Sequence, residues 1–447
     1  MEGPAETLAY VAGLSAPGKG ANALGVVDVD PGSSTYGTVV GWWEAPGSDD
    51  EFHHYGWNAC SSALCPSAPH PHVERRYLLV PGIRSSRIYV LDVKENPRQP
   101  KLVKVIEAEE LRRRAGYSRP HTLHCGPEGI YVSCLGGAEP GDPGGVALLD
   151  HNSFEVLGAF EIDRGPQRLA YDLWWHLADD TMITSEWGTP ADIEDGLVGE
   201  RLMAREYGHA LHFWDLRRRR HVQRLDLGSQ YQMVLELRPA HDPRHLYGFT
   251  GVVVNVEDLS GSIWTWHRDG DRWAITKVID IPAEPADPSR LPPLLQPFGA
   301  VPPLITDIDL SMDDRFLYVS CWGTGELRQY DVQDPFHPVL SGTLQIGGIV
   351  RRTPHPAAPA TPLAGGPQMV EISRDGRRVY FTNSLYAAWD DQFYPDGVGS
   401  WMVKADIGAS GGMTFDPAFF PQDFRGLRVH QVRLEGGDCS SDSYCFS

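Results

Sequence analysis

Short hydrophobic runs separated by turn residues dominate this chain. The runs are rich in Val, Ile, Tyr, Phe and Trp, and the segments between them contain Gly, Pro, Asp and Ser. Such runs predict β-strands, because β-branched and aromatic side chains fit a pleated, partly buried surface. Sustained helical periodicity is hard to find, so the pattern predicts an all-β protein.

One unit of this pattern recurs about seven times along the sequence. It consists of a short apolar strand, a Gly-containing turn, a strand that ends in Asp, and a partner strand, with a further short strand upstream of most copies. One unit cannot bury both of its faces alone, whereas copies arranged radially leave only short, protected edges. The repeats therefore predict a seven-bladed β-propeller that forms a single domain over residues 1–447.

The two ends of the chain are expected to close this ring together. No innermost strand precedes the first repeat, TLAYVAGL, whereas the C-terminal segment LRVHQVRLEGGD supplies a spare strand. The C-terminal strand is therefore predicted to complete the first blade.

Composition narrows the class of partner and the compartment. The formal net charge of −20 disfavours nucleic acid and anionic membrane surfaces. No apolar run approaches the roughly 20 residues of a membrane span, and the first residues do not resemble a signal peptide. We therefore expect a cytoplasmic protein whose seven cysteines remain thiols.

Histidines gather at the predicted starts of the innermost strands, which converge at one level of the central channel. The polar residues at this level are His53, His54, His121, His124, Gln167, Arg168, Glu236, Asp307, Gln368 and His430.

Several imidazoles with a nearby thiolate would suit copper or zinc better than magnesium or calcium. Neighbouring side chains of a regular strand point to opposite faces, so a metal shared by His53 and His54 requires an irregular strand end or bulge. The alternative is that these histidines only form hydrogen bonds at a polar channel mouth.

Cys60 follows the two adjacent histidines in the stretch HHYGWNAC. A thiolate near cationic or metal charge has a lowered pKa, so Cys60 is a candidate nucleophile, metal ligand or selenium ligand. An exposed loop thiol without a role is the alternative.

Longer blocks of the sequence carry a family resemblance. From about residue 24 to the C-terminus, the chain resembles the selenium-binding proteins, a family that includes methanethiol oxidases. The matching blocks are HHYGWNACSS, SSRIYVLDV, HTLHC, FEVLGAFE, YDLWW, SEWGTP, LITDIDLSMDDRFLYVSCW, LRQYDVQDP, AGGPQMVEIS, SLYAAWDDQFYP and GGDCSSD.

The resemblance implies a seven-bladed propeller and copper-dependent oxidation of methanethiol by oxygen and water to formaldehyde, hydrogen sulfide and hydrogen peroxide. It also implies selenium binding through a cysteine, which falls on Cys60. The metal-binding histidines of the family correspond to His53, His54, His121 and His124.

One departure concerns the ligand set. Animal and plant relatives carry a histidine before the RQYD stretch, where this chain has Thr324. A threonine cannot replace an imidazole ligand, so the site here is expected to use a different set that includes His430.

The implied chemistry needs a one-electron centre, because oxygen reacts sluggishly with closed-shell thiols. Flavin and haem motifs are absent from the sequence, which favours a protein-bound metal. Glu186 and Asp307 are candidates for the base. The expected partners are a small thiol and O2, and the competing hypotheses are a selenium or metal carrier that uses Cys60 without turnover, and a propeller that binds other proteins.

Overall fold

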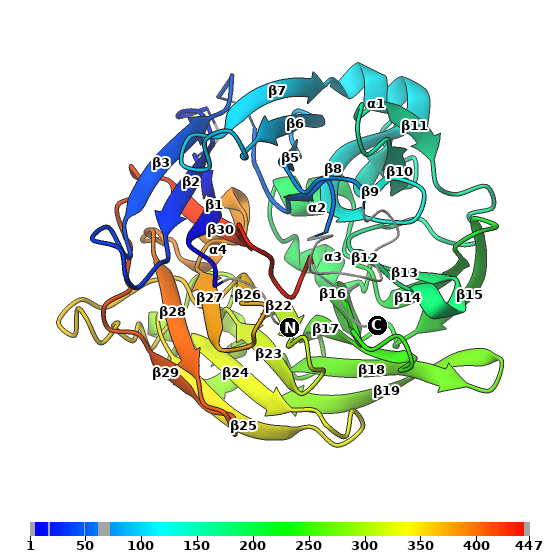
Figure 1. Cartoon of the computed structure of the whole chain (residues 1–447). Coiled ribbons are helices and arrows are strands. Elements are labelled where there is room, and N and C mark those ends of the chain that lie inside the picture. The colour runs from blue at the N-terminus through cyan, green and yellow to red at the C-terminus, as the bar shows by residue number, and fades with distance from the viewer. Residues whose placement is uncertain (1–4, 17, 49, 61–71, 442–447) are drawn as a thin grey trace.

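Seven four-stranded antiparallel sheets form a ring around a central axis (Figure 1). The computed structural model describes residues 5–16, 18–48, 50–60 and 72–441. The ring of seven sheets confirms the predicted seven-bladed β-propeller. In six of the sheets the strands follow one another along the chain from the channel outward.

The strands of the first four blades are short, and most are buried along their length. They are β1 (Leu8–Leu14), β2 (Ala23–Asp28), β3 (Val39–Glu44) and β30 (Arg428–Leu434); β4 (Gly56–Trp57), β5 (Tyr77–Gly82), β6 (Arg87–Asp92) and β7 (Lys101–Ile106); β8 (Tyr117–Cys125), β9 (Ile130–Gly137), β10 (Gly145–Leu149) and β11 (Val156–Ala159); β12 (Leu173–His176), β13 (Thr181–Ser185), β14 (Ala210–Asp215) and β15 (Arg220–Asp226).

The remaining three blades have the same plan, and a two-stranded sheet of β20 (Glu284–Pro285) and β21 (Ala300–Val301) separates the fifth from the sixth. Their strands are β16 (Tyr231–Pro239), β17 (Tyr247–Asn255), β18 (Gly261–Asp269) and β19 (Arg272–Ile281); β22 (Ile305–Leu310), β23 (Phe316–Cys321), β24 (Glu326–Asp331) and β25 (Val339–Gln345); β26 (Val370–Ile372), β27 (Arg378–Thr382), β28 (Met402–Ile407) and β29 (Met413–Phe415).

The C-terminal strand closes the ring. β30 is the innermost strand of the first blade and pairs antiparallel with β1, with Ala9 opposite Leu434. Every residue of β1 is buried, so without β30 its backbone hydrogen-bonding groups would face the channel as an open sheet edge. The predicted closure by the C-terminal strand is confirmed.

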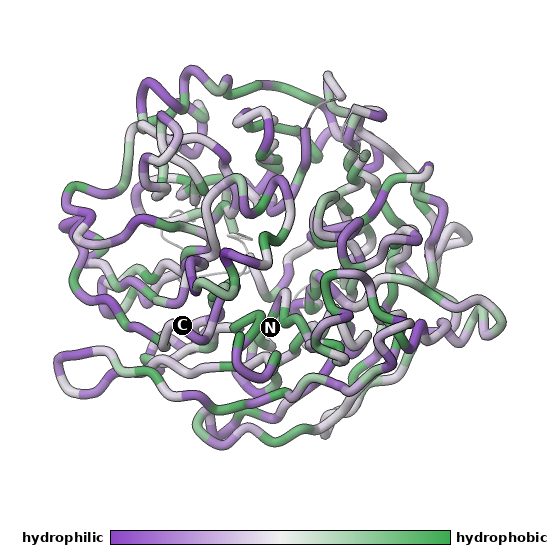
Figure 2. The backbone as a smooth tube through the Cα atoms, turned by 180° about the vertical axis from the view of Figure 1, so that it is seen from behind, coloured by the Kyte–Doolittle hydropathy of each residue, from purple (hydrophilic) through white to green (hydrophobic). Residues whose placement is uncertain are grey.

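Apolar side chains pack between neighbouring blades. One cluster joins the second and third blades through residues such as Leu79, Val90 and Val132. Figure 2 shows the ring from behind, with hydrophobic stretches in the blades and hydrophilic stretches in many outer turns. Since each sheet buries both faces against its neighbours, second strands such as β5 and β23 are buried along nearly their whole length rather than on alternate residues.

A further apolar cluster spans the second to seventh blades and therefore lies at the centre of the ring. We call it the central cluster; its large members include Tyr171, Trp187, Leu235, Trp322, Tyr386 and Trp389. Several of these residues belong to loops and helices that follow second strands of blades, which places the central cluster at one end of the channel.

Short helices interrupt the repeats at this end and at the rim. They are α1 (Ala108–Ala115), η1 (Leu177–Asp179), α2 (Pro190–Glu194), α3 (Gly199–Met203), η2 (Pro288–Arg290), η3 (Gln296–Phe298) and α4 (Ala387–Phe393). A capping box between Thr189 and Asp192 starts α2. None of the helices in the described part of the chain has the length and apolar character of a membrane span.

Candidate metal centre

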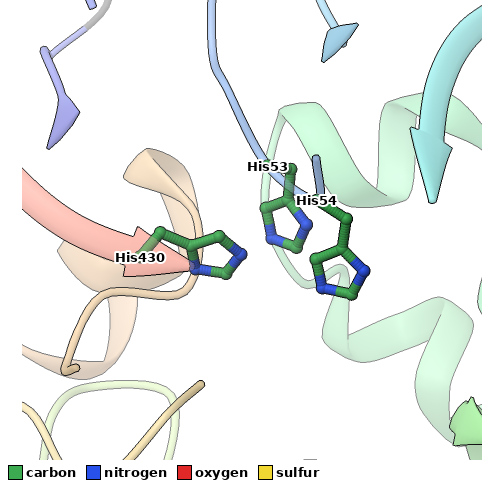
Figure 3. Close-up of side chains that lie close together, drawn as sticks. All are labelled: His53, His54 and His430. Atoms are coloured by element: carbon green, nitrogen blue, oxygen red, sulfur yellow. The ribbon is translucent and has the colours of Figure 1, made fainter. Parts of the chain in front are cut away.

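Three buried imidazoles meet inside the ring (Figure 3). His53, His54 and His430 each offer one ring nitrogen, and these nitrogens lie within 4.8 Å of one another. His430 lies on β30, whereas His53 and His54 precede β4 in a stretch without regular strand structure. The irregular backbone allows two consecutive side chains to approach one point, as the sequence pattern required.

The hydrogen bonds of these rings leave one nitrogen of each unpartnered. His430 Nδ1 donates to the carbonyl oxygen of Ser384 over 2.6 Å, and His54 Nδ1 lies 3.1 Å from Thr122 Oγ1. The Nε2 atoms of all three histidines are buried, and none has a hydrogen-bond partner among the described residues. Orphaned buried nitrogens are rare in proteins, and three that converge fit a metal ion.

His121 supports the cluster from β8. Its Nε2 lies 2.7 Å from His53 Nδ1, and its Nδ1 lies 2.9 Å from Thr122 Oγ1. Both ring nitrogens of His121 thus have a partner, and His121 contacts the nitrogen of His53 that is not directed at the other two histidines. A metal-bound histidine usually has such a partner on its second nitrogen, which fixes the orientation of the ring.

Burial keeps the cluster neutral. Desolvation is the main cause that lowers the pKa of His53, of His54 and of His121 far below the usual range, and neighbouring imidazoles add to it for all three. The same desolvation lowers the pKa of His430 to about 3. Neutral imidazole is the form that binds a metal, so the donor set is ready at physiological pH and suits copper or zinc.

Aromatic rings enclose the imidazoles. Tyr386 stacks on His53 with ring centroids 4.0 Å apart, and Tyr171 lies 4.5 Å from His121. These contacts restrict ring rotation and remove the cluster from bulk water.

Glu236 is the carboxylate that touches the cluster. Its Oε1 lies 3.4 Å from His54 Nε2 and accepts a hydrogen bond of 3.1 Å from Tyr171 Oη. Burial raises the pKa of Glu236, and the charge of Asp172 adds to the shift. Glu236 can therefore hold a proton beside the unpartnered nitrogen of His54.

Asp307, a predicted base, lies in a buried ionic network rather than among the imidazoles. Arg238 is the centre of this network, with guanidinium nitrogens 3.2 Å from Glu236, 3.7 Å from Asp172, 3.5 Å from Asp307 and 3.2 Å from Asp309. Burial and then the charge of Glu236 raise the pKa of Asp307. Among the described residues, Asp307 is connected to the cluster through Arg238 and Glu236.

Glu186, the other predicted base, lies in the fourth blade. Its Oε1 is 2.8 Å from His212 Nε2, and His212 Nδ1 is 2.9 Å from His221 Nε2. This side chain follows β13 and faces β14, so the structure does not bring it to the imidazole cluster. His212 is completely buried and accounts for the position of Glu186.

Cys60 and His124 line a different pocket, together with Cys125 and Trp174. His124 lies on β8, three residues beyond His121, and Cys60 lies three residues beyond the end of β4. His124 stacks on Trp174 at 3.9 Å. Cys60 is 3 % exposed, so it is not an exposed loop thiol. The structure separates Cys60 and His124 from the group formed by His53, His54 and His430.

The sequence analysis did not single out Ser384, Tyr386 or Thr122 as site residues. Ser384 and Tyr386 lie in the SLYAAWDDQFYP block, and Thr122 lies within HTLHC. The blocks were a signal that these segments matter. Their contacts with histidines of other blades depend on the closed ring.

Comparisons with known proteins agree with this picture. The sequence model of the family described as "56kDa selenium binding protein (SBP56)" matches residues 1–445. Human methanethiol oxidase is 39% identical, covering 99% of this chain and 96% of its own length. Mouse "Selenium-binding protein 2" is 38% identical over the same shares.

A solved structure is similar throughout. The crystal structure of a hypothetical selenium-binding protein from Sulfolobus tokodaii superposes with a TM-score of 0.95 at 56% identity, covering 99% of this chain and 97% of that one. Since the family match spans nearly the whole chain, this protein belongs to the 56 kDa selenium-binding protein family.

Proposed function

We propose that this protein is a copper-dependent methanethiol oxidase, which converts methanethiol, O2 and water to formaldehyde, hydrogen sulfide and hydrogen peroxide. The observation that carries the proposal is the buried group of three imidazoles whose Nε2 atoms have no partner among the described residues. Relatives named methanethiol oxidase, from human and from Xenopus laevis, support the reaction.

His53, His54 and His430 are the proposed copper ligands, and His121 orients His53. Bound copper supplies the one-electron chemistry that lets a closed-shell thiol react with oxygen. The hydrogen bonds from His430 to Ser384 and between His54 and Thr122 fix which nitrogen each ring presents to the metal.

Glu236 is the proposed proton-holding group of the site. A thiol must lose its proton to become a good donor, and Glu236 Oε1 lies 3.4 Å from the Nε2 atom of His54. Tyr171 holds this carboxyl group in place through its hydroxyl group. Asp307 and Glu186, the bases expected from the sequence, contact Arg238 and His212 instead.

Sulfide release tests the proposal directly. Protein stripped of metal and protein reconstituted with copper are incubated with methanethiol in air, and sulfide, formaldehyde and peroxide are measured. We expect equal amounts of the three products from the copper form only. Stoichiometric copper binding without any product would refute the oxidase.

A selenium carrier that uses Cys60 is the second candidate, and the location of Cys60 favours a separate test. Cys60 lies in a pocket apart from the imidazole cluster. Cys60→Ser should therefore lose selenium labelling while it retains copper binding. Undiminished selenium labelling of Cys60→Ser would exclude this role. The cytoplasmic location expected from the sequence stays a prediction.

A further inference from the structure

The linker between β27 and α4 holds the closing strand and the candidate ligand on it. Ser384 lies in this β27–α4 linker (residues 383–386) and donates its backbone N–H to the carbonyl oxygen of Val429 over 2.9 Å. The carbonyl oxygen of Ser384 accepts the 2.6 Å hydrogen bond from His430 Nδ1. Both backbone groups of Ser384 are therefore bonded to β30, and its carbonyl oxygen restricts the rotation of the His430 ring.

Asp390, in the first turn of α4, holds the linker against β30. Its Oδ1 accepts a hydrogen bond of 2.9 Å from the backbone N–H of Leu385, and its Oδ2 accepts one from Ser384 Oγ. The same Oδ2 lies 3.0 Å from Arg428 Nη1, and Arg428 is two residues before His430 on β30. The carboxylate of Asp390 thus joins the linker to the strand that carries His430.

Glu51 holds the other end of the linker against the segment that carries His53. It lies two residues before His53, and its Oε1 accepts a hydrogen bond of 2.7 Å from the backbone N–H of Ala387, the first residue of α4. Its Oε2 is 3.1 Å from Arg84 Nε. Tyr386, at the end of the linker, stacks on the His53 ring. One short segment therefore contacts both His430 and His53.

The two imidazoles need such a constraint, because they come from different blades. His430 lies on β30 of the first blade, His53 precedes β4 of the second, and these two strands belong to separate sheets. The ring centroids of His53 and His430 are nevertheless 3.7 Å apart. No ladder of strand hydrogen bonds sets this distance, whereas the β27–α4 linker is bonded to both sides.

We propose that Asp390 and Glu51 are positioning residues of the metal centre, which set the distance and orientation of His430 relative to His53 through the β27–α4 linker. The inference rests on the proposed function, because it takes these histidines as copper ligands. Both carboxylates act through the linker and do not bind the metal. Contacts that orient ligands in this way are worth about 10–100-fold in metal affinity.

Copper affinity tests the role of Asp390. Asp390→Asn replaces one carboxylate oxygen with an amide nitrogen, which cannot accept a hydrogen bond from Arg428. The Kd for copper, measured in competition with a chelator, should rise about 10–100-fold. Asp192→Asn is the matched control and should keep the wild-type Kd, because Asp192 is equally buried and accepts from Thr189 Oγ1, the Thr189 N–H and Arg201, but in α2. Denaturant unfolding of both metal-free variants separates a change in affinity from a change in stability.

Two substitutions of Glu51 test the other end of the linker, and they carry the test alone if Asp390→Asn fails to fold. Glu51→Ala removes the acceptor of the Ala387 N–H, so its Kd for copper should rise about 10-fold or more. Glu51→Gln keeps an acceptor oxygen at this position and should restore most of the affinity. Equal affinities of Glu51→Gln and Glu51→Ala would contradict the role of Glu51.

The Nδ1 proton of His430 gives a readout that needs no metal. In metal-free wild-type protein this buried, hydrogen-bonded proton should give a downfield NMR signal that is absent from His430→Ala. Asp390→Asn should shift the signal, because the Ser384 carbonyl group moves, whereas Asp192→Asn should leave it in place. An unshifted signal in Asp390→Asn would overturn the positioning role of Asp390.

The possible failures are distinguishable. Wild-type protein that binds no copper contradicts the proposed function, and the NMR signal still tests the positioning role. Wild-type protein that binds copper, with the same Kd in Asp390→Asn and Glu51→Ala, overturns the inference alone. A rise in Kd as large in Asp192→Asn as in Asp390→Asn also overturns it, because the effect would then follow from the loss of any buried carboxylate.

Discussion

At the scale of single residues, the proposed copper binding depends on which nitrogen each imidazole leaves open. Partners on one nitrogen of His430 and His54 leave Nε2 available, whereas His121 has partners on both. His430 and His121 are both fully buried and neutral, yet their hydrogen bonds give them different proposed roles, one as a ligand and the other as a support. The difference lies in their hydrogen bonds, which no local sequence pattern reveals.

His430→Ala should abolish stoichiometric copper binding, because it removes one of only three open nitrogens in the cluster. Copper content after reconstitution and gel filtration measures the loss. His337→Ala is the control, since the His337 side chain is 83% exposed at the surface. Equal copper content in both variants would exclude His430 as a ligand.

His121→Ala should weaken copper binding about 10–100-fold without abolishing it, because losing an orienting partner costs that much in known metal sites. Titration of the variant against a competing chelator gives the affinity. A loss as complete as that of His430→Ala would instead show that His121 binds the metal directly.

At the scale of secondary-structure elements, the closing strand both completes the fold and carries one of the proposed copper ligands. β30 pairs with β1 and presents His430 to the cluster, while Leu434 is fully buried against the seventh and first blades. Ring closure and the proposed copper binding therefore depend on the same strand.

Leu434→Ala should destabilise the protein by about 2–5 kcal/mol, the usual range for a fully buried leucine. Leu340→Ala, in β25, should change the free energy of unfolding by less than about 0.5 kcal/mol, because Leu340 is 50% exposed. Denaturant unfolding gives both values. A single transition would also support the prediction of one domain over residues 1–447, whereas two separate transitions would contradict it.

At the scale of the whole molecule, the acidic chain buries many titratable groups, and their shifts have opposite effects on stability. Raised carboxyl pKa values, as for Glu236, favour the folded state as the pH falls. Lowered histidine pKa values have the opposite sign, because the folded state then binds fewer protons than the unfolded state. His176 illustrates this: it accepts a hydrogen bond from Trp266 Nε1 over 3.0 Å, and burial lowers its pKa to about 3.

His176→Gln should therefore reduce the acid sensitivity of the fold. Between the unfolded pKa of about 6.5 and pH 4.5, neutral His176 costs the wild type about 2–3 kcal/mol that glutamine does not. Unfolding free energies of both proteins are measured across this interval. Parallel curves would show that His176 does not contribute.

The repeats alone determined the seven blades and their closure, because strand period and turn chemistry are local and a repeated unit has few ways to bury both faces. The convergence of His53, His54 and His430 also followed from that register. Only the tertiary structure decided the rest. It placed His121 beside His53 and Glu236 beside His54. It placed Cys60, His124 and Glu186 in contacts away from the three imidazoles. Residues such as Leu385 and Trp187 belong to different blades and come together only in the closed ring. Their contacts depend on side-chain packing between blades, which no local pattern encodes.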